Sequence, residues 1–126
     1  MSKKICIAID AMGGENAPYK NIEGIYLFWK KNKKGNDFFF NIFGDEQKVN
    51  SELKKYNISE KCYKIFHTSS TVSDNETPLT AVKTSKNSSM WNSVYSQVKS
   101  ESDISLSAGN TGVLLVISRM ILKTIN

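Results

Sequence analysis

The sequence predicts an α/β fold in which a mostly parallel sheet is flanked by helices. Short runs of apolar and β-branched residues alternate with longer segments whose apolar residues recur three and four positions apart. Glycine, asparagine or aspartate follows most of these runs, as expected of turns. Strands that alternate with helices favour right-handed crossovers and therefore parallel strand pairs.

The first half of the chain contains two expected strands and two expected helices. Residues 5–11 are apolar on both faces of a strand, which is typical of the centre of a parallel sheet. Residues 19–34 carry an apolar stripe of helical spacing, and residues 38–43 form an aromatic strand that we assign to the core. Residues 46–56 form a second helix with one apolar face.

The second half begins with a third strand at residues 63–67 and a polar loop at residues 68–75. A helix is expected from Leu79, because Thr77 suits its cap and Pro78 its first turn.

Three further elements complete the predicted fold. Ser88 or Ser89 suits the cap of another helix. Residues 103–106 then form a short strand that we expect to be buried, and a tight turn leads into a helix over residues 111–125.

The composition is that of one soluble globular domain spanning residues 1–126. Of these residues, 40% are apolar and 23% are charged, and 17 basic against 12 acidic residues give a net charge of +5. Sixteen of the basic residues are scattered lysines, and arginine, whose planar fork suits base edges, occurs only at position 119. The charge therefore argues against nucleic-acid binding and suits an acidic protein partner or an anionic membrane surface.

Cysteine and histidine are too few for a metal centre or a disulfide framework. The chain has Cys6, Cys62 and a single histidine, His67. No glycine follows Gly13 and Gly14 at the spacing of a dinucleotide fingerprint, so an NAD enzyme is not expected. The apolar runs are too short for a signal peptide or for the ~20 residues that cross a bilayer. We expect no metal, no cofactor and a cytoplasmic location.

The segment from Ser107 to Gly112 is the first candidate binding site. A turn from strand to helix leaves the first N–H groups of the helix unpaired, where the helix dipole favours an anion. Gly109 and Gly112 allow the backbone to turn sharply and to approach a ligand closely. The segment predicts a phosphate site, although a turn without a ligand explains the glycines equally well.

A second candidate follows the first strand. Asp10 stands at the carboxyl end of that strand, where open α/β sheets bind ligands, and Gly13, Gly14 and Asn16 follow in the loop. The alternative is an ordinary loop whose aspartate accepts hydrogen bonds from nearby backbone amides.

A third candidate is the cluster of Lys86, Ser88 and Ser89. It is either an ordinary helix cap or a second set of anion donors.

Four motifs, taken together, resemble the PlsX family of phosphate acyltransferases. They are Ile7–Gly14, the Glu76-x-Pro78 pair, Ser88-Ser89-Met90 and Ser107–Gly112. They occur in the order of the family and span nearly the whole chain. Asp-Ala-Met-Gly-Gly, followed about a hundred residues later by Ser-Ala-Gly-Asn-Thr-Gly, is the most specific combination.

This resemblance implies an enzyme that forms acyl phosphate from inorganic phosphate and the fatty acyl group of acyl carrier protein, in phospholipid biosynthesis. It also implies a homodimer whose fold is related to isocitrate dehydrogenase and phosphotransacetylase. Association with the inner face of the membrane, or with a glycerol-phosphate acyltransferase, is compatible with it. Acyl carrier protein is acidic, which suits a basic surface.

In such a reaction phosphate itself is the nucleophile, so we expect positioning and electrostatics to supply most of the catalysis. Lys86 and Asp10 are the expected catalytic residues, with Asp10 either orienting a lysine, accepting a proton from phosphate, or acting structurally. The expected binding residues are Gly13, Gly14, Asn16, Ser88, Ser89, Ser107, Gly109, Asn110, Thr111 and Gly112.

Members of this family are more than twice as long as this chain, so we expect the second half of the fold to be absent and leave open whether the chain alone is active. Several apolar side chains of the last helix should then lack cover and cause instability or association. They are Val113, Leu114, Val116, Ile117, Ile121 and Ile125.

Three other functions remain open. A phosphate- or nucleotide-binding module without catalysis would fit the turns. An inactive fragment, or a subunit that needs a separately encoded second half, would fit the length. A nucleic-acid binder would show a steep salt dependence, and the scattered lysines argue against it.

Overall fold

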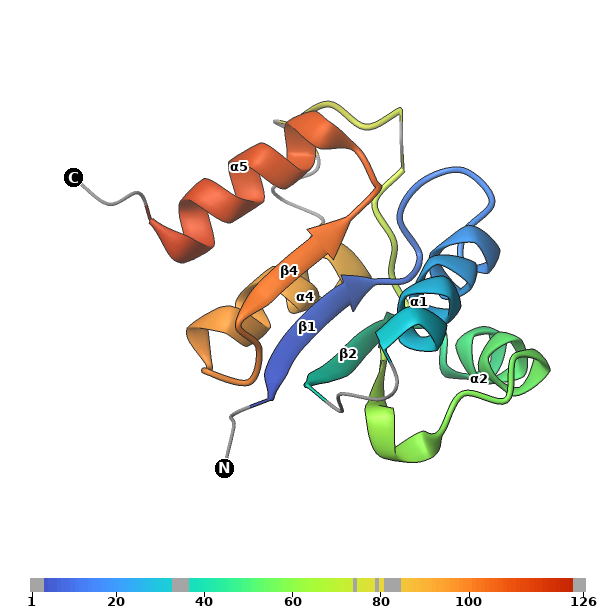
Figure 1. Cartoon of the computed structure of the whole chain (residues 1–126). Helices are drawn as coiled ribbons and strands as arrows, with labels where there is room; N and C mark the ends of the chain where they lie inside the picture. The colour runs from blue at the N-terminus through green and yellow to red at the C-terminus, as the bar shows by residue number, and fades with distance from the viewer. Residues whose placement is uncertain (1–3, 33–36, 74, 79, 81–84, 124–126) are drawn as a thin grey trace.

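The part of the chain that the structure describes forms a four-stranded sheet with helices on both faces (Figure 1). The computed structural model describes residues 4–32, 37–73, 75–78, 80 and 85–123. The elements follow in the order β1 (Ile5–Asp10), α1 (Tyr19–Asn32), β2 (Phe38–Gly44), α2 (Glu46–Lys55), a 3-10 turn η1 (Glu60–Cys62), β3 (Tyr63–His67), α4 (Ser89–Val98), β4 (Ile104–Ser107) and α5 (Thr111–Leu122).

The strand order is β3-β2-β1-β4, and every neighbouring pair is parallel. β1 lies between β2 and β4, with Ile7 level with Phe40 on one side and with Ile104 on the other. These three side chains therefore share one face of the sheet. The predicted α/β class with a parallel sheet is confirmed.

The predicted elements agree with the structure to within a few residues wherever the chain is described. Leu79, most of the helix expected after it, and Ile125 lie outside the described residues. The cap of α4 is Ser88, whose hydroxyl accepts a hydrogen bond from the amide of Trp91. Helix α1 begins at Tyr19 as expected, and Asn16, in the loop before it, adopts a left-handed φ of 59°.

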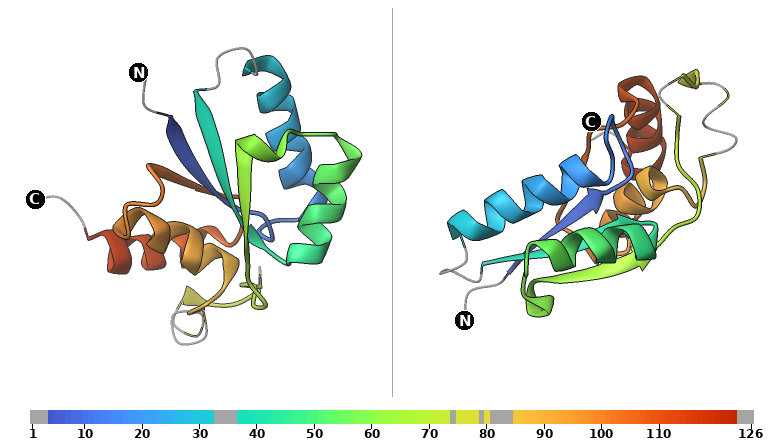
Figure 2. Two further views of the ribbon diagram at one scale, coloured as in Figure 1. Left: turned by 90° about the horizontal axis from the view of Figure 1, so that it is seen from below. Right: turned by 90° about the vertical axis from the view of Figure 1, so that its right-hand side faces the viewer.

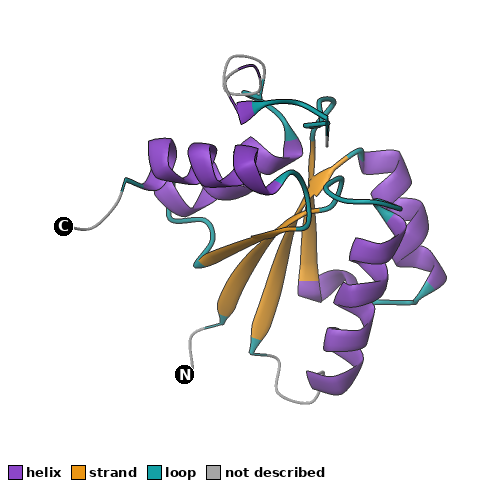
Figure 3. Ribbon diagram, turned by 90° about the horizontal axis from the view of Figure 1, so that it is seen from above, coloured by secondary structure: helices purple, strands orange, loops and turns teal. Residues whose placement is uncertain are grey.

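Helices α1 and α2 cover one face of the sheet, and α4 covers the other (Figures 2 and 3). The first face holds the larger apolar core, which β1, β2, α1 and α2 all enter. Its buried members are Ile7, Ile9, Ala11, Ile22, Ile25, Phe40, Ile42, Val49, Leu53 and Ile58. Burial of these branched and aromatic side chains gives this half of the molecule its stability.

The face beneath α4 is smaller and more polar. The buried Asn41 of β2 donates to the carbonyl of Glu101 and to Ser102 Oγ, each at 2.9 Å. Ser93 and Ser96 of α4 are also buried, and each hydroxyl donates to a backbone carbonyl of its own helix. Small side chains with internal partners let α4 lie close to the sheet without leaving polar groups unsatisfied.

The expectation that the last helix lacks cover is wrong for two of its residues. Val113 and Ile117 are fully buried against Met90 and Val94, because α5 packs directly on α4. Leu114 and Ile121 are partly buried against the same cluster. Other apolar residues of α5 do remain exposed, with Leu115 at 69%.

The expectation that the last strand is buried is also wrong. β4 lies at an edge of the sheet, and Ile104 and Leu106 are 45% and 54% exposed. Their face of β4 lies beside α1, which covers the neighbouring β1 and β2. A short apolar run predicts a strand but not whether a helix lies above it.

Candidate functional site

Two turns meet at the carboxyl end of the sheet, one after β1 and one after β4. A Cβ added to Gly13 would lie 2.6 Å from Asp10 Oδ2 and 2.9 Å from the amide nitrogen of Gly109. Gly14 has a φ of +89°, and a Cβ there would lie 2.8 Å from the carbonyl oxygen of Ala108. The glycines of the first motif are therefore required by contact between the two turns, whether or not a ligand binds nearby.

Asp10 ties these turns together. It is 2% exposed, and its Oδ2 accepts a hydrogen bond of 2.7 Å from Ser107 Oγ, while Oδ1 accepts one of 3.2 Å from the amide of Met12. Ser107 Oγ in turn accepts from the amide of Gly109 at 3.1 Å. Through these hydrogen bonds Asp10 joins the turn after β1 to the turn after β4.

Asn110 links the β4 turn to the loop that contains Glu76. Its side-chain oxygen accepts from the amide of Val113, which makes it the N-cap of α5. Its amide nitrogen donates to the carbonyl of Glu76 at 2.7 Å and to that of Ser73 at 3.2 Å. Through these hydrogen bonds to the backbone, Asn110 fixes the start of α5 against the loop that contains Glu76.

Met90 brings the third motif to the same place, since a Cβ on Gly109 would lie 2.8 Å from its methyl group. Ser88 and Ser89, which precede it, are 0% and 1% exposed. The amide of Ser89 donates to the carbonyl of Ser70. These two serines begin α4 below the surface, whereas Lys86 is exposed. The four sequence motifs therefore converge, but their side chains differ in access to solvent.

The N-terminus of α5 is more exposed to solvent than the N-terminus of α4. The first backbone hydrogen bond of this helix runs from the amide of Leu114 to the carbonyl of Asn110. Thr111 and Gly112 come before that bond, so their N–H groups have no acceptor within α5. Thr111 is exposed and Gly112 partly so. These amides and the helix dipole offer an anion a favourable position.

Asn21 is a residue that the sequence analysis did not single out. Its side-chain amide donates to the carbonyls of Ala11 and Gly13 at 2.8 and 2.9 Å, which holds the first turn against α1. An asparagine in the first turn of a helix after a glycine-rich loop is the signal that could have identified it. Asn16, in contrast, is exposed, and its carbonyl accepts from the amide of Lys20.

The described residues contain no group of three or more histidine, cysteine or acidic side chains that could hold a metal ion. His67 lies at the end of β3, where its Nδ1 accepts from the amide of Glu46 at 3.1 Å and so helps to begin α2. None of the described helices combines the length and the hydropathy of a membrane span.

Residues 5–126 match the family model described as fatty acid synthesis protein. The chain is 45% identical over 125 residues to the phosphate acyltransferase of Pelagibacter ubique, which covers 99% of this chain and 36% of that protein. It is 37% identical over 119 residues to the phosphate acyltransferase of Magnetococcus marinus, with 94% of this chain and 33% of the relative covered.

A third relative, the phosphate acyltransferase of Rhodospirillum rubrum, is 34% identical over 125 residues and is covered over 35% of its length. The chain thus spans about a third of the length of these relatives, while almost all of the chain is matched. Given the match from β1 to the end of the sequence, this chain belongs to the fatty acid synthesis protein family, the family of the phosphate acyltransferases that it resembles.

Proposed function

We propose that this chain carries the phosphate-holding part of a phosphate acyltransferase, which forms acyl phosphate from inorganic phosphate and an acyl group on acyl carrier protein. The observation that carries the proposal is the open N-terminus of α5 at the point where the four motifs converge. The amides of Thr111 and Gly112 supply donors there, and Gly109 and Asn110 set the direction of the chain into the helix.

In the proposed reaction a phosphate oxygen attacks the carbonyl carbon of the thioester. The carbon–oxygen bond of the acyl phosphate forms, the carbon–sulfur bond breaks, and the thiolate of the carrier protein leaves and takes up a proton. The negative charge that develops on the carbonyl oxygen needs hydrogen-bond donors. Phosphate is the nucleophile, so the protein has to hold and orient it rather than supply a nucleophile.

The proposed roles of individual side chains differ with their surroundings. Asp10 and Ser107 form a buried hydrogen-bonded pair and act as positioning residues for the two turns. The exposed Lys86 is a candidate charge for phosphate. Ser88 and Ser89 are buried at the start of α4, so their proposed contribution is to hold Met90 against Gly109.

The proposed partners follow from the family. Acyl carrier protein is acidic, and the net charge of +5 supports its docking on this chain. We also propose a cytoplasmic location with association at the inner membrane surface, and a homodimer; exposed apolar residues such as Leu115 support association with another polypeptide. Mass in solution and binding to anionic vesicles test these two proposals.

Substitution of Thr111 tests the phosphate site. Thr111 is the first residue of α5, a position where a helix tolerates proline. Thr111→Pro removes one amide donor, whereas Thr111→Ala keeps the amide and removes the hydroxyl. With inorganic phosphate as the probe, we expect changes in the amide chemical shifts of residues 109–112 in NMR spectra of the 126-residue chain. Thr111→Pro should weaken the binding of phosphate at least tenfold. Equal binding by the proline variant and the original chain would contradict an amide site at this position.

Catalysis is tested separately by the phosphate-dependent release of carrier-protein thiol from an acyl carrier protein thioester, with acyl phosphate identified by mass. A second candidate function, phosphate binding without acyl transfer, fits the open N-terminus of α5 equally well. Phosphate binding without thiol release would support that candidate for the chain alone.

A further inference from the structure

We infer that the open side of β4 is a docking surface for the part of the phosphate acyltransferase fold that this chain does not span. We call it the β4 surface and define it by Ile104, Leu106 and the groove between β4 and α1. The inference rests on family membership and on geometry, and it does not depend on the proposed acyl transfer.

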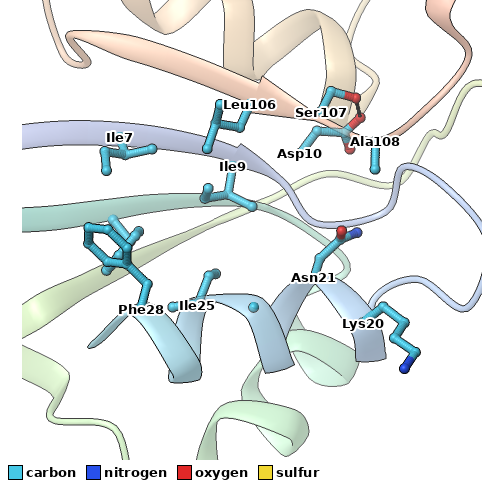
Figure 4. Close-up of a pocket in the computed structure, with 12 residues that line it drawn as sticks. Ile7, Ile9, Asp10, Lys20, Asn21, Ile25, Phe28, Leu106, Ser107 and Ala108 are labelled. Carbon is cyan, nitrogen blue, oxygen red and sulfur yellow. Dashed lines mark hydrogen bonds between the residues drawn. The ribbon is translucent and has the colours of Figure 1, made fainter. Parts of the chain in front are cut away.

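The groove is apolar along most of its length. It has a volume of about 450 Å³ and is lined by side chains from α1, β1, β2 and β4 (Figure 4). Its apolar members are Ile7, Ile9, Ile25, Phe28, Phe40 and Leu106. Polar groups, including Asp10 and Ser107, lie at the end near the two turns. A parallel sheet normally has helices over both faces, and this groove is the place where a helix beside α1 is absent from the described chain.

The backbone of β4 is open as well. It pairs with β1, and no other described strand pairs with its far side. An edge strand with exposed apolar residues offers both unpaired hydrogen-bonding groups and apolar area to another polypeptide. Helix α5 packs on α4, on the face of the sheet opposite to α1, and its described residues do not line the groove (Figures 2 and 3).

The length of the relatives identifies the occupant. The Pelagibacter ubique phosphate acyltransferase matches this chain over 36% of its own length, so most of that fold lies outside the matched region. A further strand beside β4 and a helix over the groove would bury both the edge and the apolar face. A small apolar ligand would fill the groove but leave the hydrogen-bonding edge of β4 unpaired. The remaining polypeptide of the family fold is therefore the occupant, joined to this chain or supplied separately.

Co-expression tests the inference. The 126-residue chain is produced together with the segment of the Pelagibacter ubique enzyme that lies outside the matched region, and complex formation is measured by affinity capture and by mass in solution. Leu106→Asp and Ile104→Asp place a charge on the β4 surface. Tyr19→Asp is the matched control, because Tyr19 is 56% exposed and lies in a different hollow, beside α2.

We expect a one-to-one complex with the original chain and with Tyr19→Asp, and at least tenfold weaker association for the two β4 variants. Hydrogen exchange at the amides of β4 should slow in the complex. Unfolding curves of the isolated variants show whether each chain is still folded. No complex, or a complex that neither β4 substitution weakens, would overturn the inference. Self-association through Leu106, or binding of a fatty acyl probe in the groove, without the complex would overturn it equally.

Discussion

Ile9 and Leu106 are paired across β1 and β4 and share a face of the sheet, yet Ile9 is 9% exposed and Leu106 is 54% exposed. The same contrast separates Ile7, at 5%, from its partner Ile104, at 45%. The side chains are alike in chemistry, although β1 pairs with strands on both edges and β4 pairs only with β1. The difference lies in the layer above them, because α1 covers β1 and β2 but stops short of β4. Burial in a parallel sheet is thus decided by the covering helix.

The largest effect that the comparison predicts is at Ile9. Ile9→Ala should lower the free energy of unfolding by about 2–5 kcal/mol, because it removes apolar contacts and leaves a cavity under α1. Urea unfolding followed by circular dichroism measures the change. If Ile9→Ala lowered the free energy of unfolding less than Leu106→Ala does, the difference between the covered strand β1 and the open strand β4 would be contradicted.

The link between the two strands is tested at Ser107. Ser107→Ala should cost about 1.5–3 kcal/mol, because it removes the donor to the buried Asp10 carboxylate and the acceptor of the Gly109 amide. Asp10→Asn and the double variant complete a thermodynamic cycle in urea unfolding. Strict additivity of the two single effects would mean that the pair does not couple the turn after β1 to the strand β4.

Contact between the turns is tested at Gly13. Gly13→Ala should destabilise the chain by about 1–3 kcal/mol, because the added methyl group overlaps Asp10 and the backbone of Gly109. Gly24→Ala is the matched control: Gly24 lies within α1, and a Cβ there meets nothing within 4 Å. The control should gain about 0.5–1 kcal/mol from the higher helix propensity of alanine. Equal effects of both substitutions on the melting temperature would contradict the close approach.

On the open strand we expect a much smaller effect. Leu106→Ala in the isolated chain should change the free energy of unfolding by less than about 1 kcal/mol, because more than half of the side chain is already in water. The same substitution in the complex with the remaining family fold should cost more. A large cost in the isolated chain would show that β4 is covered in solution.

The smallest predicted effect belongs to the ion pair between the exposed Lys55 and the buried Glu52, on the covered half of the molecule. A hydrogen bond from Lys55 Nζ to Glu52 Oε1, 2.8 Å long, and the charge of Glu52 raise the pKa of Lys55 above 10.5. A pKa that is higher in the folded state stabilises the fold below pH 10.5, and this stabilisation is lost as the pH rises through the folded-state value. The stability difference between the original chain and Lys55→Met should therefore shrink at high pH. Lys54→Met, at the neighbouring exposed position, is the matched control for the loss of one lysine charge.

The local elements could be predicted from the sequence because they depend on short-range chemistry. Short, nearly continuous apolar runs predicted β1 and β2, and apolar residues at helical spacing predicted α1 and α2. The sequence predicts Ser88 or Ser89 as the cap of α4, because a serine hydroxyl can accept a hydrogen bond from a nearby backbone amide, and the structure selects Ser88. The binding role of the start of α5 remains a prediction, although the helix itself begins at Thr111 as expected.

The tertiary structure decided which of these elements are covered and what the motif glycines contact. Packing of α5 on α4 buries Val113 and Ile117, and the lack of a helix beside α1 leaves Leu106 exposed. Gly13 meets Gly109 across nearly a hundred residues of sequence. Composition and spacing describe a residue relative to its own helix or strand, whereas burial and close contact depend on the neighbours that a segment acquires when the layers assemble. In this chain, helices cover most of the apolar side chains of β1 and β2, whereas Ile104 and Leu106 of β4 remain exposed.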